Sequence, residues 1–317
     1  MSEQQNAQPA FTVFVPTYNR AQLLPRLLEC MEAQTFQNFE LLIVDDGSTD
    51  GTYDYLKSYE PKGRFRLRVL RHDENRGLPM GFNTALENAE GLLFTTINSD
   101  DTIPPNALER FWYWWNYAHT NYPAANIVGV EALCGDMHTG EVIGEVFPQS
   151  PMVSDRVEIH FVYRCRGDKV RAIRTDIISK YRFPQVQGEK FIEPAYLWNQ
   201  LGYDRHKILY FNEILCYKEY LKDGLSHNVF KLHSQNPRLQ TMYFSLLVQR
   251  SLEDGRVPEE DIKLFFADWV RFSLYTESFG SVVSRSLQFG LPKRLWWRGL
   301  LIGVRRRVKD PFRSRST

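Results

Sequence analysis

Two adjacent carboxylates, Asp100 and Asp101, follow the apolar run GLLFTTI (residues 91–97) within the stretch INSDDTIPP. Neighbouring carboxylates repel each other, so a positive group is expected beside them. Mg²⁺ or Mn²⁺ can supply it, because each ion takes carboxylate oxygens on one side and phosphate oxygens on the other. The motif therefore indicates a site for a divalent cation, which would act there as a Lewis acid. The alternative is that one of the two acids only caps the helix that opens at Pro104.

Polar side chains also follow three further runs that are typical of strands, at 11–15, 39–44 and 66–72. In open α/β sheets, ligands bind outside the carboxyl ends of the strands. Four polar clusters after four consecutive strands therefore predict one shared site. The clusters are Thr17, Tyr18 and Arg20; Asp45, Asp46 and Ser48; His72, Asn75 and Arg76; and Asn98, Ser99, Asp100 and Asp101.

The elements that must position these clusters alternate between strand and helix four times, from residue 11 to the helix that opens at Pro104. The strands are apolar throughout, as expected when helices cover both faces. This pattern predicts an α/β fold with a doubly wound, mostly parallel sheet. From 126 to 225 the pattern is mixed, and after about residue 236 apolar residues recur at spacings of three and four, which predicts a helical C-terminal region.

The C-terminal segment 291–317 has a different composition, with many Lys and Arg residues, a single acid at Asp310, and two tryptophans. Its apolar residues can share one broad helical stripe. A basic amphipathic helix with tryptophans is suited to an anionic membrane interface. The alternative is a helix that docks on the protein core and carries a basic end.

Composition sets few further limits. The net charge is +1. The four cysteines form no C-x-x-C pair, so neither a disulfide framework nor a zinc site is expected. A reducing cytoplasm is therefore the expected compartment. The first ten residues do not form a signal peptide pattern, and no apolar run approaches the roughly 20 residues of a membrane span. We therefore expect a cytoplasmic protein that associates peripherally with the inner face of the cell membrane.

Three segments, in order and at this spacing, carry a family resemblance: FTVFVPTYNR with the following FELLIVDDGSTDGT, then HDENRGLPMGFNTALENAEG, then INSDD. Together they resemble the nucleotide-binding half of a family 2 glycosyltransferase with the GT-A fold, of the bacterial surface-polysaccharide type. The resemblance is close from 11 to about 115 and continues loosely to about 230. It implies an inverting, metal-dependent enzyme that moves a sugar from a nucleotide-sugar to a hydroxyl of a saccharide acceptor, which the basic segment suggests is lipid-linked.

The resemblance also implies a division of the chain. It comprises a disordered tail (1–10), a GT-A catalytic domain (11–228) with a nucleotide-binding half (11–115) and an acceptor half (116–228), a helical region (229–290) and the basic membrane-interface segment (291–317).

Carried over residue by residue, the resemblance assigns the nucleotide site. Uracil's imide N–H suits a carboxylate acceptor at Asp45 or Asp46, so a UDP-sugar is the expected donor. For Gly77 a plain turn glycine is the alternative to a direct contact. The nucleotide-binding residues are Pro16, Thr17, Tyr18, Arg20, Asp45, Asp46, Asn75, Gly77, Asn83, Asn98 and Ser99.

The metal, Mn²⁺ or Mg²⁺, would be held by Asp100, with Asp101 beside it and His227 as a further ligand; His233 is the weaker candidate of the two histidines. Asn98 stands where the family usually has an aspartate, and this substitution keeps an acceptor oxygen but removes a charge.

The catalytic base is expected in a Glu-Asp pair that opens a short helix before a tryptophan. Counting back from Trp198, Glu193 takes the first place of the pair and Pro194 the second, where the base usually stands. Glu193 is therefore one candidate base and Glu189 the other. The alternative is that these glutamates only start a helix.

Other classes of protein remain to be weighed against a transferase. Asn98 and Pro194 also fit a catalytically weak nucleotide-sugar-binding subunit that acts as a membrane scaffold. A nucleotidyltransferase is disfavoured because the first loop, PTYNR, has no glycine, and a dehydrogenase because no G-x-G-x-x-G follows a strand. No nucleic-acid partner is expected, and the aromatic stripes of helices within 236–280 could form a homo-oligomer interface.

Overall fold

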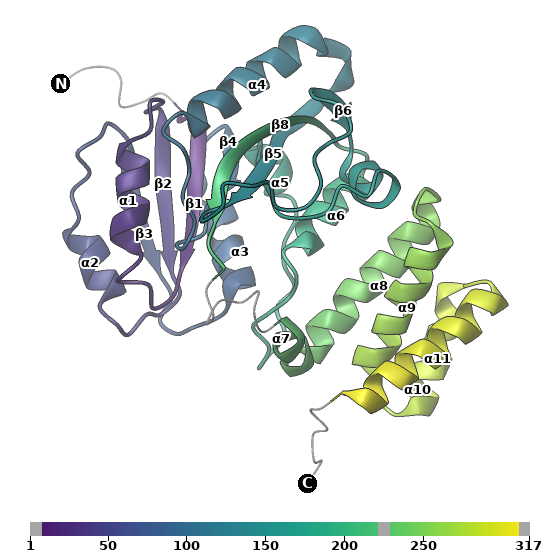
Figure 1. The fold of residues 1–317 in the computed structure, drawn as a ribbon. Helices are drawn as coiled ribbons and strands as arrows, with labels where there is room; N and C mark the ends of the chain where they lie inside the picture. The colour runs from purple at the N-terminus through teal and green to yellow at the C-terminus, as the bar shows by residue number, and fades with distance from the viewer. Residues whose placement is uncertain (1–7, 221–228, 311–317) are drawn as a thin grey trace.

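The structure is a computed structural model that describes residues 8–220 and 229–310. Its described strands form one sheet in the order β3-β2-β1-β4-β7-β5-β8-β6 (Figure 1). The strands are β1 (Phe11–Thr17), β2 (Phe39–Asp45), β3 (Arg66–Arg71), β4 (Leu93–Thr96), β5 (Ile127–Asp136), β6 (Met152–Ser154), β7 (Lys169–Arg174) and β8 (Lys207–Lys218).

Helices cover both faces of the first half of the sheet. Along β1, Val13 and Val15 pack into one core with helix α1 (Leu24–Glu32) and helix α4 (Ala107–Asn121), while Phe14 packs into the opposite core with helix α3 (Leu78–Asn88). Successive side chains of a strand point to opposite faces, so an apolar run can fill two cores at once. The predicted doubly wound α/β architecture is confirmed.

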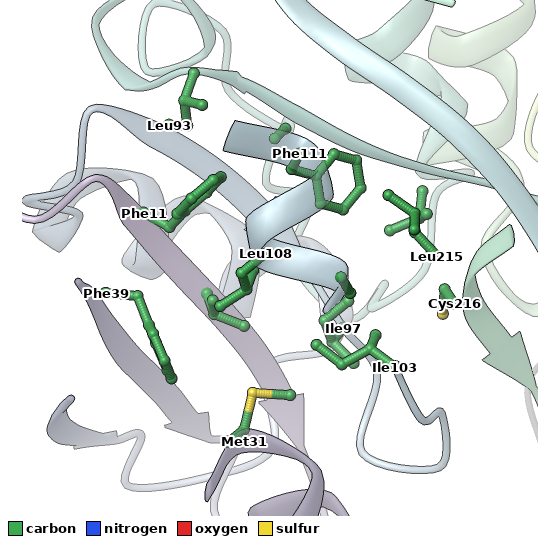
Figure 2. Close-up of a cluster of buried hydrophobic side chains, with 14 of the residues drawn as sticks. Phe11, Met31, Phe39, Leu93, Ile97, Ile103, Leu108, Phe111, Leu215 and Cys216 are labelled. Carbon is green, nitrogen blue, oxygen red and sulfur yellow. The ribbon is translucent and has the colours of Figure 1, made fainter. Parts of the chain in front are cut away.

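Figure 2 shows the core on the α1 and α4 face. Phe11 and Phe39 come from neighbouring parallel strands, and Leu108 and Phe111 reach them from α4. Ile97 belongs to the same cluster and immediately precedes the polar motif of residues 98–101. The apolar core therefore anchors the strand end at which the acidic motif begins.

The second half of the sheet is mixed. β7 lies between β4 and β5 and is antiparallel to both, whereas β8 is parallel to β5. Of the seven pairings among the described strands, four are parallel. As a result the carboxyl ends of β1, β2, β4 and β8 meet the amino end of β7 at one edge of the sheet.

The remaining helices are α2 (Thr52–Ser58), α5 (Thr175–Ile178), α6 (Ala195–Tyr203), α7 (Val229–Gln235), α8 (Pro237–Asp254), α9 (Glu259–Ser273), α10 (Phe279–Ser286) and α11 (Lys293–Lys309). Helices α8 to α11 pack together beside the sheet (Figure 1). Leu239, Tyr243 and Leu247 of α8 join the same core as Phe14, so the helices are not separated from the sheet by solvent. Along the described chain, no helix is long and apolar enough to cross a membrane.

Helix α11 docks on α9 along one face. Leu295 and Leu300 are buried there. Gly303 allows close approach, because a Cβ at this position would lie 2.4 Å from the carbonyl oxygen of Ala267. The basic segment was interpreted either as a membrane-interface helix or as a helix docked on the protein core. Docking on α9 accounts for one face of this helix.

Candidate active site

A cavity of about 1030 Å³ opens at the edge where β1, β2 and β4 end and β7 begins. Its volume is at the upper end of the range for small-molecule sites, so a nucleotide-sugar and part of a second substrate can occupy it together. All four predicted loops contribute to its wall. Among the predicted site residues, those that line it are Pro16, Thr17, Tyr18, Arg20, Asp46, Asn75, Gly77, Asn98, Ser99, Asp100 and Glu193.

The loop after β1 is held by hydrogen bonds to the loop after β2. The Asn19 amide N–H donates to Ser48 Oγ at 2.8 Å, and Asn19 Oδ1 accepts from the Thr49 amide at 2.9 Å. The Thr17 hydroxyl is buried in the cavity wall and has no partner among the described residues. Tyr18 is 42% exposed beside it. The loop is thus fixed in place while it offers a free hydroxyl and an aromatic ring to a ligand.

Asp46, rather than Asp45, faces the cavity. Burial by itself would raise the pKa of the Asp46 carboxyl, but hydrogen bonds from His72 Nδ1 at 2.7 Å and from the amides of Arg76 and Gly77 outweigh it and hold this pKa below its usual value. Asp45 is fully buried, accepts from the Ser48 amide at 3.3 Å, and does not belong to the cavity wall. Asp46 therefore both shapes the loop after β3 and places a negative charge in the cavity wall.

Gly77 is required by its surroundings. Its φ of +90° lies in the region that side chains disfavour, and a Cβ would fall 2.0 Å from the Lys190 carbonyl oxygen. Asn83, one turn into α3, does not line the cavity, because its amide exchanges two hydrogen bonds of 2.9 Å with the backbone of Phe183. The structure thus gives Asn83 a structural contact in place of the nucleotide contact that was expected.

The two acids of the INSDD motif have different surroundings. Asp100 is half-buried and lines the cavity. Asp101 is 2% exposed, lies outside the cavity wall, and its Oδ2 accepts from Lys218 Nζ at 2.6 Å and from Asn98 Nδ2 at 2.9 Å. The positive group beside Asp101 is therefore a lysine at the end of β8, and the expected role of Asp101 as a metal ligand is corrected to one half of an internal ion pair.

The donor set for a divalent cation is small. Within residues 8–220 and 229–310, no three His, Cys, Asp or Glu side chains come together as a metal centre. Mg²⁺ at diphosphate sites is often held by one or two carboxylates and the phosphates themselves. Asp100 in the cavity wall fits that pattern. The predicted ligand His227 lies outside the described residues.

Glu193 also lines the cavity and lies just before α6. Its Oε1 is 2.6 Å from Nε2 of His233, which belongs to α7. The imidazole stacks on Phe191 and meets Phe272 edge-on, so its orientation is fixed by packing. One carboxylate oxygen is therefore anchored, and the other is left for the cavity.

Glu189 has a structural position instead. Its two carboxylate oxygens accept from the amides of Arg238 and Leu239 at 3.0 and 2.8 Å, in the first turn of α8. A carboxylate in this place satisfies amides that have no partner within the helix and interacts favourably with the helix dipole. Glu189 is also absent from the wall of the large cavity. Of the two candidate bases, the geometry favours Glu193.

The segment before Glu193 is clamped from two sides. Asn236 Oδ1 accepts from the amides of Lys190 at 2.6 Å and Phe191 at 3.1 Å. On the other side the Lys190 carbonyl packs against Gly77. The loop that contains Gly77, the residues that lead to Glu193, and the start of α8 are therefore in direct contact with one another.

Several cavity residues carry no motif in the sequence, among them Lys218 and Arg156. They are separated from their partners Asp101 and Asn199 by long stretches of chain, so spacing alone does not reveal them. The pairing of His233 with Glu193 was not foreseen either, because the sequence offered His233 only as the weaker of two candidate metal ligands. Lys169 and Arg171 did carry a signal, because two cations at alternate positions of an otherwise apolar strand share one face.

Comparison with known proteins identifies the family. The family model described as glycosyl transferase family 2 matches residues 12–181, which is more than half of the chain. This chain belongs to glycosyl transferase family 2. The family resemblance seen in the sequence is thus confirmed.

Its relatives are bacterial glycosyltransferases. An uncharacterized glycosyltransferase of Haemophilus influenzae is 25% identical over 228 residues, 70% of this chain and 84% of that protein. The putative teichuronic acid biosynthesis glycosyltransferase TuaG of Bacillus subtilis is 36% identical over 105 residues, 33% of this chain and 41% of that protein. GlyA of Streptococcus pneumoniae is 35% identical over 226 residues, 68% of this chain but 31% of that protein. The matched region thus spans less than half the length of TuaG and of GlyA.

Solved structures share the fold. The structure of S. aureus TarS 1-349 in complex with UDP-GlcNAc has a TM-score of 0.66 at 18% identity, and the match covers 94% of this chain and 89% of that one. The mannosyltransferase PcManGT from Pyrobaculum calidifontis, in complex with GDP-Man and Mn²⁺, has a TM-score of 0.55 at 17% identity, with 97% and 89% covered. At such identities the likeness establishes the GT-A fold alone.

Proposed function

We propose that this glycosyltransferase moves a sugar from a UDP-sugar to a hydroxyl of a saccharide acceptor, with inversion at the sugar carbon. The observation that carries the proposal is that Asp100, Glu193 and residues of the loops after β1, β2 and β3 line one cavity. The TarS structure in complex with UDP-GlcNAc supports a UDP-sugar, and the likeness to TuaG, a putative teichuronic acid biosynthesis glycosyltransferase, supports a bacterial surface polysaccharide.

The nucleotide binds at the ends of β1, β2 and β4. Thr17 and Tyr18 contact the nucleoside, and Asp46 fixes the turn at Gly77 that closes this end of the cavity. Asp100 would hold Mg²⁺ or Mn²⁺. When bound, the cation supplies a positive charge for the departing diphosphate.

Glu193 acts as the general base. The acceptor oxygen forms a bond to the sugar carbon while the bond from that carbon to the diphosphate oxygen breaks, and the electron pair leaves with UDP. The acceptor proton passes to the free oxygen of Glu193. His233, whose Nε2 lies 2.6 Å from the other oxygen, is a positioning residue that holds the Glu193 carboxylate in place.

The test is release of the nucleoside diphosphate by purified protein, with UDP-, GDP- and dTDP-sugars in turn, in Mn²⁺, Mg²⁺ or EDTA. Metal-dependent release from one UDP-sugar supports the proposal if Asp100→Asn and Glu193→Gln abolish it. The control Glu87→Gln, on the exposed side of α3, should keep it. Binding of UDP by calorimetry without turnover of any donor, tested together with acceptor glycans, would instead favour a nucleotide-sugar-binding scaffold, which Pro194 at the usual base position also fits.

We also propose that α11 attaches the enzyme to an anionic membrane surface, where a lipid-linked acceptor would lie. The face turned away from α9 exposes Trp297 by 65%, Leu301 by 51% and Val308 by 61%. Lys and Arg side chains flank this face, namely Lys293, Arg294, Arg298, Arg305 and Lys309. An exposed apolar strip bordered by cations suits the interface of anionic lipids.

A further inference from the structure

Three half-buried cations line the cavity, from elements that lie beyond β4 in the sheet and away from β1 and β2. Arg171 and Lys169 come from β7, and Arg156 from the turn that follows β6; all three line the cavity. Arg171 is 13% exposed and stacks on the indole of Trp198, with its guanidinium carbon 4.6 Å from the ring centre. The side chains are thus held by rigid elements beneath the cavity rather than displayed in solvent.

The cations are only partly compensated. Arg171 forms a bidentate pair with Glu131, at 2.9 and 3.3 Å, which uses both carboxylate oxygens. Arg156 donates its Nε to Asn199 Oδ1 at 3.0 Å, and Lys169 donates to a backbone carbonyl; neither has a carboxylate within ion-pair distance in the described part of the chain. One buried acid therefore faces three cations.

The neighbouring groups respond to this excess of positive charge. Burial and the proximity of Arg171 lower the pKa of Arg156. Burial, together with Arg156 and other nearby cations, lowers the pKa of His160 to about 3. Excess donors at a buried site are costly unless an acceptor is supplied, and a bound anion would supply it.

We infer that this end of the cavity binds a carboxylate or phosphate group carried by a saccharide, with Arg156 and Lys169 as its ligands. The inference rests on the proposed function, because it names the class of sugar that the transferase takes. Arg171 orients the site through Trp198 and Glu131. The same chemistry can come from two sources: an acidic sugar on the donor, such as a uronic acid, or an acidic group on the acceptor.

Calorimetry with matched ligands separates the two sources. In the donor arm, UDP-glucuronate is compared with UDP-glucose. In the acceptor arm, protein saturated with UDP is titrated with glucuronate, glucose 6-phosphate and glucose. We expect the anionic ligand to bind about tenfold tighter than its neutral counterpart in one arm, since a charge-assisted hydrogen bond in a buried site discriminates strongly. Arg156→Gln and, separately, Lys169→Gln should remove that preference and leave the affinity for UDP itself unchanged.

Arg166→Gln is the matched control. It removes a cation from the segment that leads into β7 but lies outside the cavity wall, so it should keep the preference for the anionic ligand. Equal binding of anionic and neutral ligands in both arms would overturn the inference. If the protein still binds UDP in that case, the proposed function is not affected. A parallel loss of UDP affinity in both variants would also overturn it, since the cations would then serve the diphosphate. Lys169→Gln, at a half-buried position, keeps the test decisive if Arg156→Gln does not fold.

Discussion

Lys218 Nζ lies 2.6 Å from Asp101 Oδ2, although 116 residues separate them in the chain. The pair neutralises one of the two adjacent acids of the INSDD motif from within the protein. Of the two acids, Asp100 lines the cavity, where we propose that it holds a cation. The two neighbouring carboxylates therefore have separate surroundings: Asp101 ties the loop after β4 to the end of β8, and Asp100 faces the cavity.

The separate surroundings predict separate phenotypes. Asp101→Asn should lower the free energy of unfolding by about 3 kcal/mol, because it leaves the Lys218 ammonium buried without a counter-charge. Asp100→Asn should change it by less than about 0.5 kcal/mol while it abolishes metal-dependent UDP release. Urea unfolding measures both, and the double variant Asp101→Asn/Lys218→Met should recover part of the loss. Equal destabilisation by both single variants would contradict this division.

The pair of Glu193 and His233 predicts a graded loss of activity. Glu193→Gln should lower kcat by about 10² to 10⁴, the usual range for a general base. His233→Phe keeps the ring packing but removes the hydrogen bond, so we expect a loss of about tenfold in kcat with the affinity for UDP unchanged. Steady-state kinetics with separate calorimetry distinguishes the two effects. A His233→Phe variant that loses UDP binding instead would show that the histidine has no role in positioning the base.

The half-buried His160 predicts a pH dependence of stability. Its pKa is about 3 in the folded protein against a reference value of 6.5, so the unfolded chain binds more protons between these values. Stability should therefore fall as the pH falls through this window. Between pH 8 and pH 5 the wild type should lose about 1 to 2 kcal/mol more than His160→Gln. Urea titrations at each pH measure the slope, and parallel slopes for the two proteins would refute the assignment.

The exposed face of α11 predicts membrane binding without a role in catalysis. The triple variant Trp297→Ser, Leu301→Ser and Val308→Ser should lose sedimentation with phosphatidylglycerol vesicles and keep UDP release. Its control replaces Phe279 and Leu287, which are also exposed, with Ser. Surface substitutions are the right test, because deletion of 291–317 would uncover the core that Leu300 helps to fill. Unchanged sedimentation of the triple variant would remove α11 from the membrane proposal.

Gly77 predicts a substitution that damages the site through the backbone. A Cβ here would overlap the Lys190 carbonyl at 2.0 Å and force an unfavourable positive φ. Gly77→Ala should therefore cost at least about 1 kcal/mol of stability and weaken UDP binding. Gly51→Ala, which has a similar φ but open space around it, is the matched control and should show the backbone strain alone. Equal effects in the two variants would show that the contact with Lys190 is unimportant.

The sequence predicted the first half of the sheet and its loops well, because apolar runs such as Phe39–Asp45 mark buried parallel strands and their polar ends must converge. It did not separate Asp45 from Asp46, since which of two neighbours faces a cavity depends on how the chain turns after the strand. It also did not reveal the Lys218 partner of Asp101, because that contact depends on where β8 enters the sheet. These pairings arise from topology rather than from local pattern.

The clamp on the segment before Glu193 bears on how such enzymes could be recombined. Asn236 accepts hydrogen bonds from the backbone of Lys190 and Phe191, and Glu189 accepts one from the first turn of α8. These residues therefore cannot be exchanged between proteins without the helices that hold them. A chimera that joins a foreign helical region at residue 228 would take Glu193 from one parent and its partner His233 from the other. Donor specificity should be exchangeable by swapping the loops of the first half, whereas the segment from 186 to 254 should transfer between homologues only as a single block.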